Sequence, residues 1–566
     1  MIERHEQSTL IHYLLQWQAQ KPDAIYLTQP QGDGTVIDYS WAVVADQARR
    51  MATHLQAMNL PAGSSIAILG KNSAHWIIAD LAIWIAGHIS VPLYPTANTD
   101  TVRYVLEHAQ ARLLFVGRLE GGASTWQALS AGVPAGLPVI SLPLGACDAQ
   151  GTWDDIIACT EPLHDFTLPD PAQLATLIYT SGSTGQPKGV MHSFGTLCEA
   201  PMINACALFR GGRGPNGEER MLSYLPLAHG AERQGVEAMS LRLGSHVFFN
   251  DSLETFTADL QRARPTFFFS VPRLWTKFYQ GINQKIPRQE QLAAFADPQR
   301  AGQMKAQILT ALGLDQVHTA LTGSAALPAE VISWYGELGL ELLEGYAMSE
   351  NFACSHFTRP GQVRPGYVGQ CLPGVECRIA DDGEILVKSP GQMLGYYKQP
   401  ELTAQSYTED GFFRTGDRGI QDEEGRLRIV GRVKELFKTA KGKYVAPVPI
   451  EMRLANHPQI EASCVTGMGL PQPFALINIS PAARQVLMDQ TQRQALVQSL
   501  EALLEVVNAQ AESHEHLASL VVVSEPWTVE NDLLTPTLKI RRNQIEDHYQ
   551  SRMDGWSSSA SRVIFE

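Results

Sequence analysis

The sequence predicts an α/β protein with a large N-terminal domain of layered α/β subdomains that carries a small β-barrel-like subdomain, followed by a small, mobile α+β C-terminal domain. Three observations support this fold class. Short apolar segments alternate with amphipathic segments up to about residue 430, and within 361–430 the apolar segments are short and separated by turns. A basic segment follows, and after it strand-like and helix-like segments alternate again. We expect the domains to span residues 1–431 and 432–566, with a hinge near 432–435.

The N-terminal domain is predicted from strand-like and helix-like segments that alternate along the chain. Helical spacing, entered by a Ser or Asp that can cap a helix, marks Asp38–Met58 and Ser252–Ala263. Alternation of this kind implies α/β layers, in which ligands lie at the carboxyl ends of the strands. The segments with strand composition are Ser65–Gly70, Arg112–Gly117, Ala175–Thr180, Ser245–Asn250 and Thr266–Pro272.

The later segments favour smaller structural units. Val375–Ala380, Gly383–Ser389 and Arg426–Gly431 are short apolar stretches between Gly, Pro and Asp-Gly turns, which indicates a small β-subdomain or distorted barrel. Beyond the basic segment, a predicted helix at Arg484–Asn508 lies among further strands, which indicates a separate α+β domain of about 130 residues. These strands are Ala462–Gly469, Phe474–Ser480 and Ala518–Ser524.

Composition excludes several classes of protein. The 566 residues carry a formal net charge of −14, which argues against a nucleic-acid-binding face. Eight cysteines are scattered without a C-x-x-C pair, so their spacing indicates neither a zinc site nor a disulfide framework. We expect a cytoplasmic protein with reduced thiols.

The most apolar window does not have the pattern of a membrane span. Trp76–Pro95 is interrupted by Asp80, Gly87 and Pro92, which is typical of a buried helix that leads into a strand. The N-terminus likewise lacks the apolar core and cleavage site of a signal peptide. Peripheral contact with the inner face of a membrane is left open.

The loop within Leu177–Ser193, LIYTSGSTGQPKGVMHS, follows a predicted strand and is rich in glycine and hydroxyl groups. Backbone N–H groups that a Cβ would crowd, hydroxyl donors and one cation, Lys188, suit phosphate oxygens. A linker is the alternative interpretation, but linkers seldom follow a buried strand directly. The loop is not a Walker A motif, because Lys188 lies between Pro187 and Gly189, and this disfavours a kinase or ATPase.

YTSGSTGQPKGV is similar to the signature loop of the AMP-forming acyl- and aryl-CoA synthetases, the adenylating superfamily that includes luciferases and peptide-synthetase adenylation domains. Further motifs of that family follow in the same order. They are YLPLAH (Tyr224–His229), GSAAL (Gly323–Leu327), EGYAMSE (Glu344–Glu350), FRTGD (Phe413–Asp417), GRVKELFKTAKGKYVAP from Gly431, and LTPTLKIRR (Leu534–Arg542). The chain therefore resembles this superfamily over most of its length, and its long-chain fatty acyl-CoA synthetases most.

The resemblance implies a set of site residues. Lys539 would bring a mobile cation to the acid and the α-phosphate, and His229 would guard the acid pocket. Glu350 and Thr184 would bind Mg²⁺, which prefers oxygen ligands. The implied catalytic residues are Lys539, Glu350, Lys188 and His229. The implied cofactor-binding residues are Thr180, Ser181, Gly182, Ser183, Thr184, Gly185, Gly323, Ser324, Ala325, Gly345, Tyr346, Ser349, Asp417, Arg432, Lys434 and Gly442.

Several of these residues have individual roles in the family pattern. Tyr346 would offer a face to adenine, Ser349 would contact the α-phosphate, and Asp417 would accept hydrogen bonds from the ribose hydroxyls. Lys434 matches the hinge position and Gly442 the rotating loop. Without the motifs around them, Tyr346 would be interpreted as core packing and Asp417 as a turn residue.

The resemblance implies a two-step reaction. A carboxylic acid and ATP, with Mg²⁺, give acyl-AMP and pyrophosphate, and coenzyme A then displaces AMP. The apolar and aromatic stretch Phe267–Ile282 suits a medium- or long-chain fatty acid, and the motifs offer no acidic partner for an amino acid's ammonium. Two alternatives stay open: a ligase that loads an acyl or aryl acid onto a carrier protein, and a non-catalytic nucleotide-binding scaffold. The sequence does not predict the oligomeric state.

Overall fold

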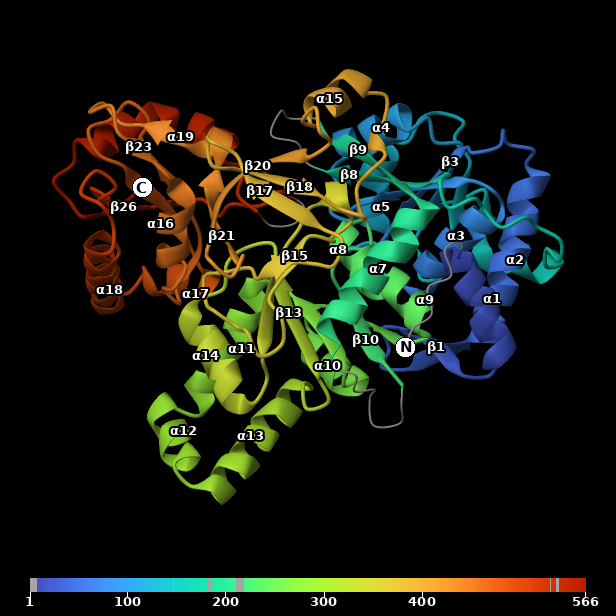
Figure 1. Ribbon diagram of the computed structural model, residues 1–566, viewed down its shortest axis with the longest axis horizontal. Helices are drawn as coiled ribbons and strands as arrows, with labels where there is room; N and C mark the ends of the chain where they lie inside the picture. Colours follow the sequence, from blue (N-terminus) through green and yellow to red (C-terminus); the bar gives the residue numbers. More distant parts are fainter. Residues whose placement is uncertain (1–7, 146, 181–185, 210–217, 530, 536–538) are drawn as a thin grey trace.

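The computed structural model has a large and a small part. It describes residues 8–145, 147–180, 186–209, 218–529, 531–535 and 539–566. In Figure 1 the large part runs from the blue N-terminal segment to the yellow strands, and the small orange and red C-terminal part lies beside those strands. The predicted fold class, a mixed α/β protein with a large N-terminal and a smaller C-terminal domain, is confirmed.

An eight-stranded sheet forms the centre of the large domain. Its order is β19-β9-β8-β4-β3-β5-β6-β7, parallel from β8 to β7. At the other edge β8 and β9 pair antiparallel, and so do β9 and β19. The strands are β3 (Ser65–Leu69), β4 (Ile89–Leu93), β5 (Leu113–Val116), β6 (Val139–Ser141), β7 (Gly151–Thr152), β8 (Leu174–Thr180), β9 (Lys188–Ser193) and β19 (Gly395–Tyr396).

Helices that cover this sheet include α3 (Ala74–Ile85), in which every residue is buried. Ser73 caps it by accepting a hydrogen bond from the N–H of Trp76. The apolar window is thus a buried helix that leads into β4, as predicted. The other helices of this region are α1 (Leu10–Gln20), α2 (Trp41–Ala57), α4 (Thr99–His108), α5 (Ala123–Ser130), α6 (Trp153–Cys159) and α7 (Phe194–Leu208). No helix in the described ranges is both long enough and apolar enough to cross a membrane.

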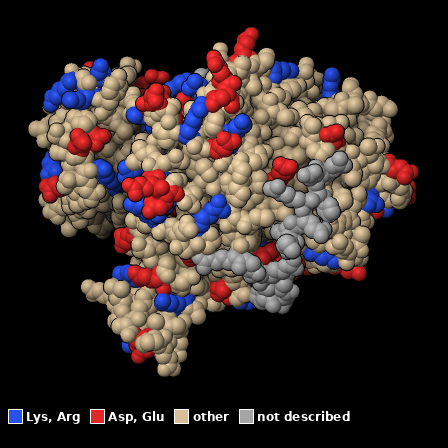
Figure 2. Space-filling view, viewed as in Figure 1, with Lys and Arg blue, Asp and Glu red and all other residues tan. Residues whose placement is uncertain are grey.

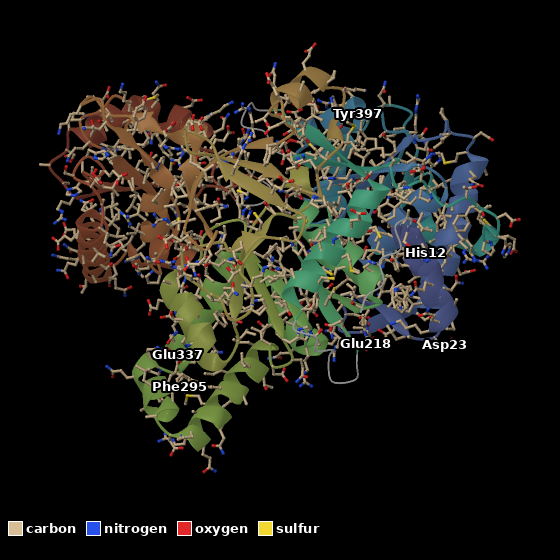
Figure 3. The ribbon with its side chains drawn as sticks, viewed as in Figure 1. His12, Asp23, Glu218, Phe295, Glu337 and Tyr397 are labelled. Carbon is tan, nitrogen blue, oxygen red and sulfur yellow. The ribbon has the colours of Figure 1, made fainter. Side chains whose placement is uncertain are left out.

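A second α/β unit has a five-stranded sheet of order β12-β13-β14-β15-β16, in which β12, β13 and β14 are parallel. Its strands are β12 (Phe267–Ser270), β13 (Thr319–Gly323), β14 (Leu342–Tyr346), β15 (His356–Phe357) and β16 (Gln370–Cys371). Its helices are α10 (Phe256–Ala263), α11 (Pro272–Lys285), α12 (Arg288–Phe295), α13 (Pro298–Leu312) and α14 (Ala329–Leu338). Helices α12 and α13 project at the bottom of Figure 1, and Figure 3 shows Phe295 and Glu337 at the base of this projection.

Two smaller four-stranded sheets complete the large domain. One has the order β10-β11-β1-β2 and is built from β1 (Ile25–Pro30), β2 (Val36–Ser40), β10 (Arg220–Ser223) and β11 (His246–Phe249). The other is the predicted β-subdomain, an antiparallel sheet of β17 (Glu376–Ile379), β18 (Glu384–Lys388), β20 (Phe413–Gln421) and β21 (Leu427–Arg432). The short helix α15 (Pro400–Gln405) lies between β18 and β20 in sequence and follows β19.

The small domain has its own sheet, β24-β25-β26-β27, with an apolar core on each face. One core includes α18 and the other α19. The domain also carries the hairpin of β22 (Phe437–Lys438) and β23 (Tyr444–Val445). The sheet strands are β24 (Ile460–Thr466), β25 (Phe474–Ile479), β26 (Leu520–Val522) and β27 (Val563–Phe565), and the helices are α16 (Pro447–Leu454), α17 (Pro481–Val486), α18 (Gln490–Ala509) and α19 (Arg542–Ser557).

The helix predicted at Arg484–Asn508 is in fact two helices, α17 and α18. The break has a local cause, because the carboxylate of Asp489 accepts a hydrogen bond from the N–H of Gln492 and so caps a new helix. The small domain is joined to the large one by an ion pair of 2.8 Å between Arg273 of α11 and Glu461 of β24. On the face drawn in Figure 2, acidic and basic side chains are interspersed.

Candidate active site

The phosphate-binding candidates lie on the β8–β9 hairpin. Thr180 ends β8 and pairs with Lys188, the first residue of β9. Lys188 Nζ lies 5.3 Å from the ring centroid of Tyr396, on the neighbouring strand β19. The candidates Ser181, Gly182, Ser183, Thr184 and Gly185 lie outside the described residues.

Glu350 lies beside this hairpin. It follows β14 in a short 3-10 turn, Ser349–Asn351, and its Oε1 accepts a hydrogen bond of 2.8 Å from the hydroxyl of Tyr396. The position of the turn is set by its backbone, since His192 Nε2 lies 2.7 Å from the carbonyl oxygen of Ser349. Tyr396 therefore contacts both Lys188 and Glu350, which places a cation and a carboxylate around one phenol ring.

A second group of side chains gathers around Asp417 of β20. The hydroxyl of Tyr346, at the end of β14, donates a hydrogen bond of 2.8 Å to Asp417 Oδ2. Arg432 of β21 places Nε 3.0 Å from Oδ1 of the same carboxylate. Burial and the Asp417 charge raise the pKa of Tyr346, so the phenol stays protonated and donates.

Lys539 of the small domain belongs to this second group. Burial and the charge of Arg432 lower the pKa of Lys539, while Asp417 opposes this shift. Lys539 keeps exposed surface, and the charged groups that act on its amine are Arg432 and Asp417 of the large domain. The structure thus brings Lys539 to Arg432 and Asp417.

His229 is close enough to Lys539 to be affected by its charge. Its Nδ1 accepts a hydrogen bond of 3.2 Å from the N–H of Ala231, at the start of α8 (Gly230–Glu232), so the ring proton is on Nε2. Burial and the charge of Lys539 lower the pKa of His229 to about 4. The imidazole is therefore neutral near pH 7.

The segments that carry Gly323 and Gly345 meet at one sheet edge, because these residues pair between β13 and β14. A Cβ on Gly345 would lie 2.1 Å from Cε1 of Phe357, which explains the glycine. Ser324, which follows Gly323 and precedes Ala325, has a positive φ of 70°. The candidate adenine segments are therefore neighbours in space.

Lys434 and Gly442 lie apart from these groups. Lys434 is exposed in a 3-10 turn, Val433–Glu435, that links β21 to β22. Gly442 lies in the turn of the β22–β23 hairpin with φ of 76° and donates its N–H to the carbonyl of Thr439. That hairpin is held to the small domain by a backbone hydrogen bond from Ala440 to Leu470.

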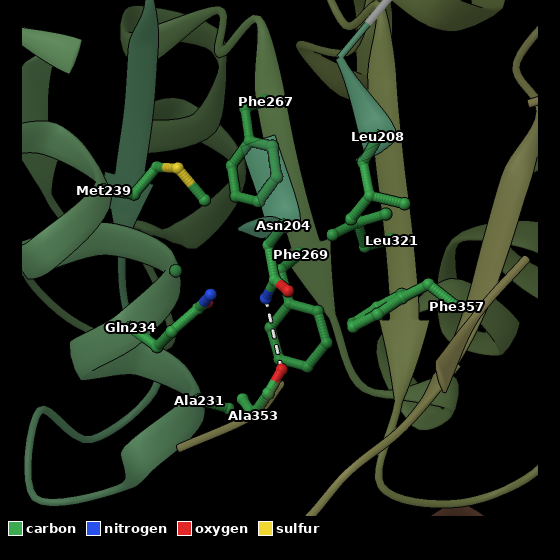
Figure 4. A pocket seen from close by; sticks show the side chains of 11 residues that line it. Asn204, Leu208, Ala231, Gln234, Met239, Phe267, Phe269, Leu321, Ala353 and Phe357 are labelled. Atoms are coloured by element: carbon green, nitrogen blue, oxygen red, sulfur yellow. Dashed lines mark hydrogen bonds between the residues drawn. The ribbon is translucent and has the colours of Figure 1, made fainter. Parts of the chain in front are cut away.

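A narrow apolar pocket lies next to His229 and Glu350 in the chain, since Ala231 and Ala353 are among the residues that line it. Figure 4 shows Gln234 and Met239 across this space from Phe269, Leu321 and Phe357. The residues that line it are Asn204, Leu208, Ala231, Gln234, Gly235, Met239, Phe267, Phe269, Leu321, Ala353 and Phe357.

The sequence prediction captured only part of this pocket. Phe267 and Phe269 of the predicted stretch line it, as alternation along a strand allows, but Trp275 of the same stretch is buried in another core. The contributions of Gln234 and Gly235 were missed. They lie on the π-helix Arg233–Ala238, whose irregular turn follows the YLPLAH motif.

Buried ionisable side chains lie on either side of the start of the π-helix. Glu232 accepts hydrogen bonds from the Ser223 hydroxyl (2.9 Å) and the Tyr224 N–H (3.0 Å), and burial raises the pKa of Glu232 to about 8. Arg233 forms buried ion pairs with Asp80 of α3 and with Glu237. The pair with Asp80 ties the π-helix to α3.

The chain matches known proteins over nearly its whole length. The AMP-binding enzyme family matches residues 14–397, and the AMP-binding enzyme C-terminal domain matches 435–559. The long-chain-fatty-acid–CoA ligase FadD15 of Mycobacterium bovis is 30% identical over 570 residues, which cover 92% of each chain. Long chain acyl-CoA synthetase 2 of Arabidopsis thaliana is 28% identical over 94% of this chain and 89% of that protein.

Solved structures share the fold. The A domain of a carboxylic acid reductase from Segniliparus rugosus, in complex with AMP and a co-purified carboxylic acid, has a TM-score of 0.80 at 23% identity and covers 98% of this chain and 94% of that one. The similarity in fold, the family match over residues 14–397 and the relatives of full length agree. The chain belongs to the AMP-binding enzyme family.

Proposed function

We propose that this protein is an AMP-forming ligase that activates a medium- or long-chain fatty acid as acyl-AMP and transfers the acyl group to coenzyme A. The observation that carries the proposal is the meeting of Lys539 with Arg432, Asp417 and His229, next to an apolar pocket. The names of the relatives, long-chain-fatty-acid–CoA ligase and long chain acyl-CoA synthetase, support the choice of acid and acceptor.

Nucleotide binding is assigned to the two clusters described above. Asp417 accepts hydrogen bonds from the ribose hydroxyls, with Arg432 and Tyr346 holding its carboxylate in place. The glycines Gly323 and Gly345 allow the two proposed adenine segments to pack closely, since a Cβ on either would meet protein atoms. Thr180, Lys188 and the loop between them bind the β- and γ-phosphates, and Ser349 contacts the α-phosphate.

In the adenylation step the acid's carboxylate attacks the α-phosphate, and the bond to pyrophosphate breaks. Two anions meet, so the site must neutralise charge and align the reactants. Lys539 stabilises the charge that develops on the transferring phosphate. His229 is neutral and placed between Lys539 and the pocket residue Ala231, where it can close the pocket from solvent.

Glu350 fits a magnesium ion, since its half-buried carboxylate is a hard oxygen ligand next to the phosphate loop. Bound Mg²⁺ would neutralise phosphate charge. Tyr396 orients Glu350 through Oε1, which leaves Oε2 for a ligand. The second proposed ligand, Thr184, lies outside the described residues.

We assign the domain boundary to residues 431 and 432 and the hinge to 432–435. The 3-10 turn Val433–Glu435 is the link between β21 of the large domain and β22 of the small one. Rotation there would withdraw Lys539 and bring the hairpin with Gly442 toward the site for thioester formation. The thiolate of coenzyme A would then displace AMP.

Acid-dependent exchange of labelled pyrophosphate into ATP tests the adenylation step directly. We expect exchange to be greatest with a fatty acid in a panel of fatty, aryl and amino acids, and to decrease by about 10²–10³-fold in Lys539→Ala. ATP binding without exchange for any acid would overturn the ligase assignment. Product analysis with coenzyme A and, in parallel, with a phosphopantetheinyl carrier protein then identifies the acceptor.

A further inference from the structure

Three metal-binding side chains converge where the sheet that carries Tyr346 meets the β-subdomain sheet. His356 of β15 pairs with Cys371 of β16, and Cys377 lies on β17, the next strand in sequence. Their donor atoms, one imidazole nitrogen and two sulfurs, all lie within 4.8 Å of one another. Cysteine spacing alone concealed this group, because the three residues come from three strands and form no C-x-x-C pair.

The separations suit a single ion. Tetrahedral zinc with bonds of about 2.3 Å to sulfur and about 2.0–2.1 Å to nitrogen places sulfur and nitrogen roughly 3.5 Å apart. His356 Nε2 and Cys371 Sγ are 3.3 Å apart. A bound ion therefore requires only small side-chain shifts.

The imidazole is already oriented as a ligand. His356 is fully buried, and its Nδ1 lies 2.9 Å from the hydroxyl of the buried Ser355. When Nδ1 donates its proton to that oxygen, Nε2 presents its lone pair to Cys371. Metal-bound histidines characteristically donate the other ring N–H to an acceptor, a role that the Ser355 oxygen can fill here.

The site is accessible from one side. Cys371 and Cys377 are both partly exposed, in contrast to Cys198, Cys354 and Cys464, which are buried. An ion can therefore reach the sulfurs although His356 is buried, and a fourth position would remain for water or another ligand.

We propose that His356, Cys371 and Cys377 form a binding site for a thiophilic transition-metal ion such as Zn²⁺, separate from the magnesium site proposed at Glu350. The two thiols lose their protons to solvent as the two sulfur–metal bonds form, so no oxidation takes place. The ion links β15, β16 and β17. It thereby supports the sheet that carries Tyr346, which pairs with His356 across β14 and β15.

Metal content and thiol protection test the site together. The full-length chain without a polyhistidine tag is reduced, stripped with a chelator, incubated with Zn²⁺ and dialysed. We expect one zinc per chain by mass spectrometry of the metal, and we expect Zn²⁺ to protect Cys371 and Cys377, but not the exposed Cys159, from alkylation in peptide mapping. Co²⁺ in place of Zn²⁺ should give a thiolate charge-transfer band.

Variants separate this site from adventitious binding. Cys371→Ser and Cys377→Ser should each weaken Zn²⁺ binding by about 100-fold or more, whereas Cys159→Ser should leave it unchanged. Unchanged Zn²⁺ binding in both cysteine variants, or no protection of the two thiols in the wild-type chain, would overturn the proposal. A disulfide between Cys371 and Cys377 in the reduced, zinc-treated protein would do the same. The protection experiment needs no variant and therefore does not depend on how well the variants fold.

Discussion

Single side chains of this site take their properties from distant parts of the chain. The amine of Lys539 is partly desolvated and lies near the cation of Arg432 as well as the carboxylate of Asp417. Its amine therefore loses its proton at a lower pH than a solvated lysine does. His229 is kept neutral by burial and by that same amine, so the two residues depend on each other.

The charge of Lys539 should determine the alkaline limit of adenylation. Because its pKa is lowered, the amine becomes neutral as pH rises, and exchange should decline at a lower pH than for a lysine in water. An arginine stays charged at alkaline pH. In the Lys539→Arg protein the alkaline decline of the exchange rate should therefore move to higher pH, even if the maximal rate is lower. ATP–pyrophosphate exchange from pH 6 to pH 10 measures this, and coincident limbs in the two proteins would contradict the assignment.

Glu232 should make stability depend on pH. Its carboxyl has an ordinary pKa near 4.5 and a folded-state pKa of about 8, so between these values the folded state holds a proton that the unfolded state has released. This contribution is fully present below pH 4.5 and is lost as pH rises to 8, by up to about 1.4 kcal/mol per pH unit. Glu232→Gln should remove that slope.

Urea unfolding of both proteins at several pH values between 5 and 8 checks this. The difference in unfolding free energy between wild type and Glu232→Gln should change steadily with pH. Glu401→Gln, at an exposed position on α15, serves as the control and should show no such trend. A pH-independent difference would mean that Glu232 is ionised in the folded state.

At the scale of elements, the π-helix Arg233–Ala238 shapes the pocket. Its wide turn leaves Gly235 at the pocket wall with no atom within 4 Å of the position of a Cβ. The buried ion pairs of Arg233 hold this irregular turn against α3. The π-helix is therefore anchored to α3 at Arg233, and it leaves unfilled space beside Gly235.

Filling that open space should change which acids react. Gly235→Leu places a side chain in the pocket, and each methylene that no longer fits costs about 1–3 kcal/mol, or roughly 10- to 200-fold in kcat/KM. We expect long acids to lose activity while shorter acids are retained. Gly302→Leu, at an exposed position of α13 with equal space, is the matched control.

The comparison is made by exchange assays over a series of saturated acids. Equal losses of activity for all chain lengths would indicate a folding defect and would contradict a role of the pocket in selecting the acid.

Element types were easier to predict than their boundaries or contacts. The strands at Ser65–Gly70 and Ala175–Thr180 were visible in sequence because buried strands are continuous apolar runs. The division of Arg484–Asn508 was missed, although the apolar spacing is interrupted by the polar residues 489–494 and Asp489 is of a type that caps helices, as its hydrogen bond shows. The antiparallel pairing of β9 also could not be read from composition, which does not distinguish it from a parallel neighbour.

At the scale of the whole molecule, the position of the small domain determines which residues face the site. In this structure Lys539 faces Arg432 and Asp417, while the hairpin with Gly442 is held to its own domain. Motifs allowed Lys539, Asp417 and Glu350 to be named from sequence. The contacts that unite them, such as Tyr396 with Glu350, required the fold, because no local pattern relates residues so far apart.

Restricting the hinge should separate the two half-reactions. Lys434→Pro fixes one backbone angle in the turn Val433–Glu435, so we expect adenylation to change by no more than about two-fold and thioester formation to slow by roughly ten-fold or more. Glu409→Pro, at the second position of the Thr408–Gly411 turn, is the control, since proline is favoured there. Rapid-quench measurement of acyl-AMP and acyl-CoA distinguishes the steps, and equal slowing of both would reject the hinge.

The alternation of strand β15 has a consequence for the whole protein. Its two residues point to opposite faces, so Phe357 lines the apolar pocket while His356 belongs to the cysteine cluster. An acid in the pocket and a metal ion at the cluster would therefore both contact residues of the same two-residue strand. By thermodynamic reciprocity, any factor by which a bound acid alters the affinity for the metal is the factor by which the metal alters the affinity for the acid. If that factor differs from one, the supply of a trace metal in the cell would adjust how strongly this protein competes for its acid.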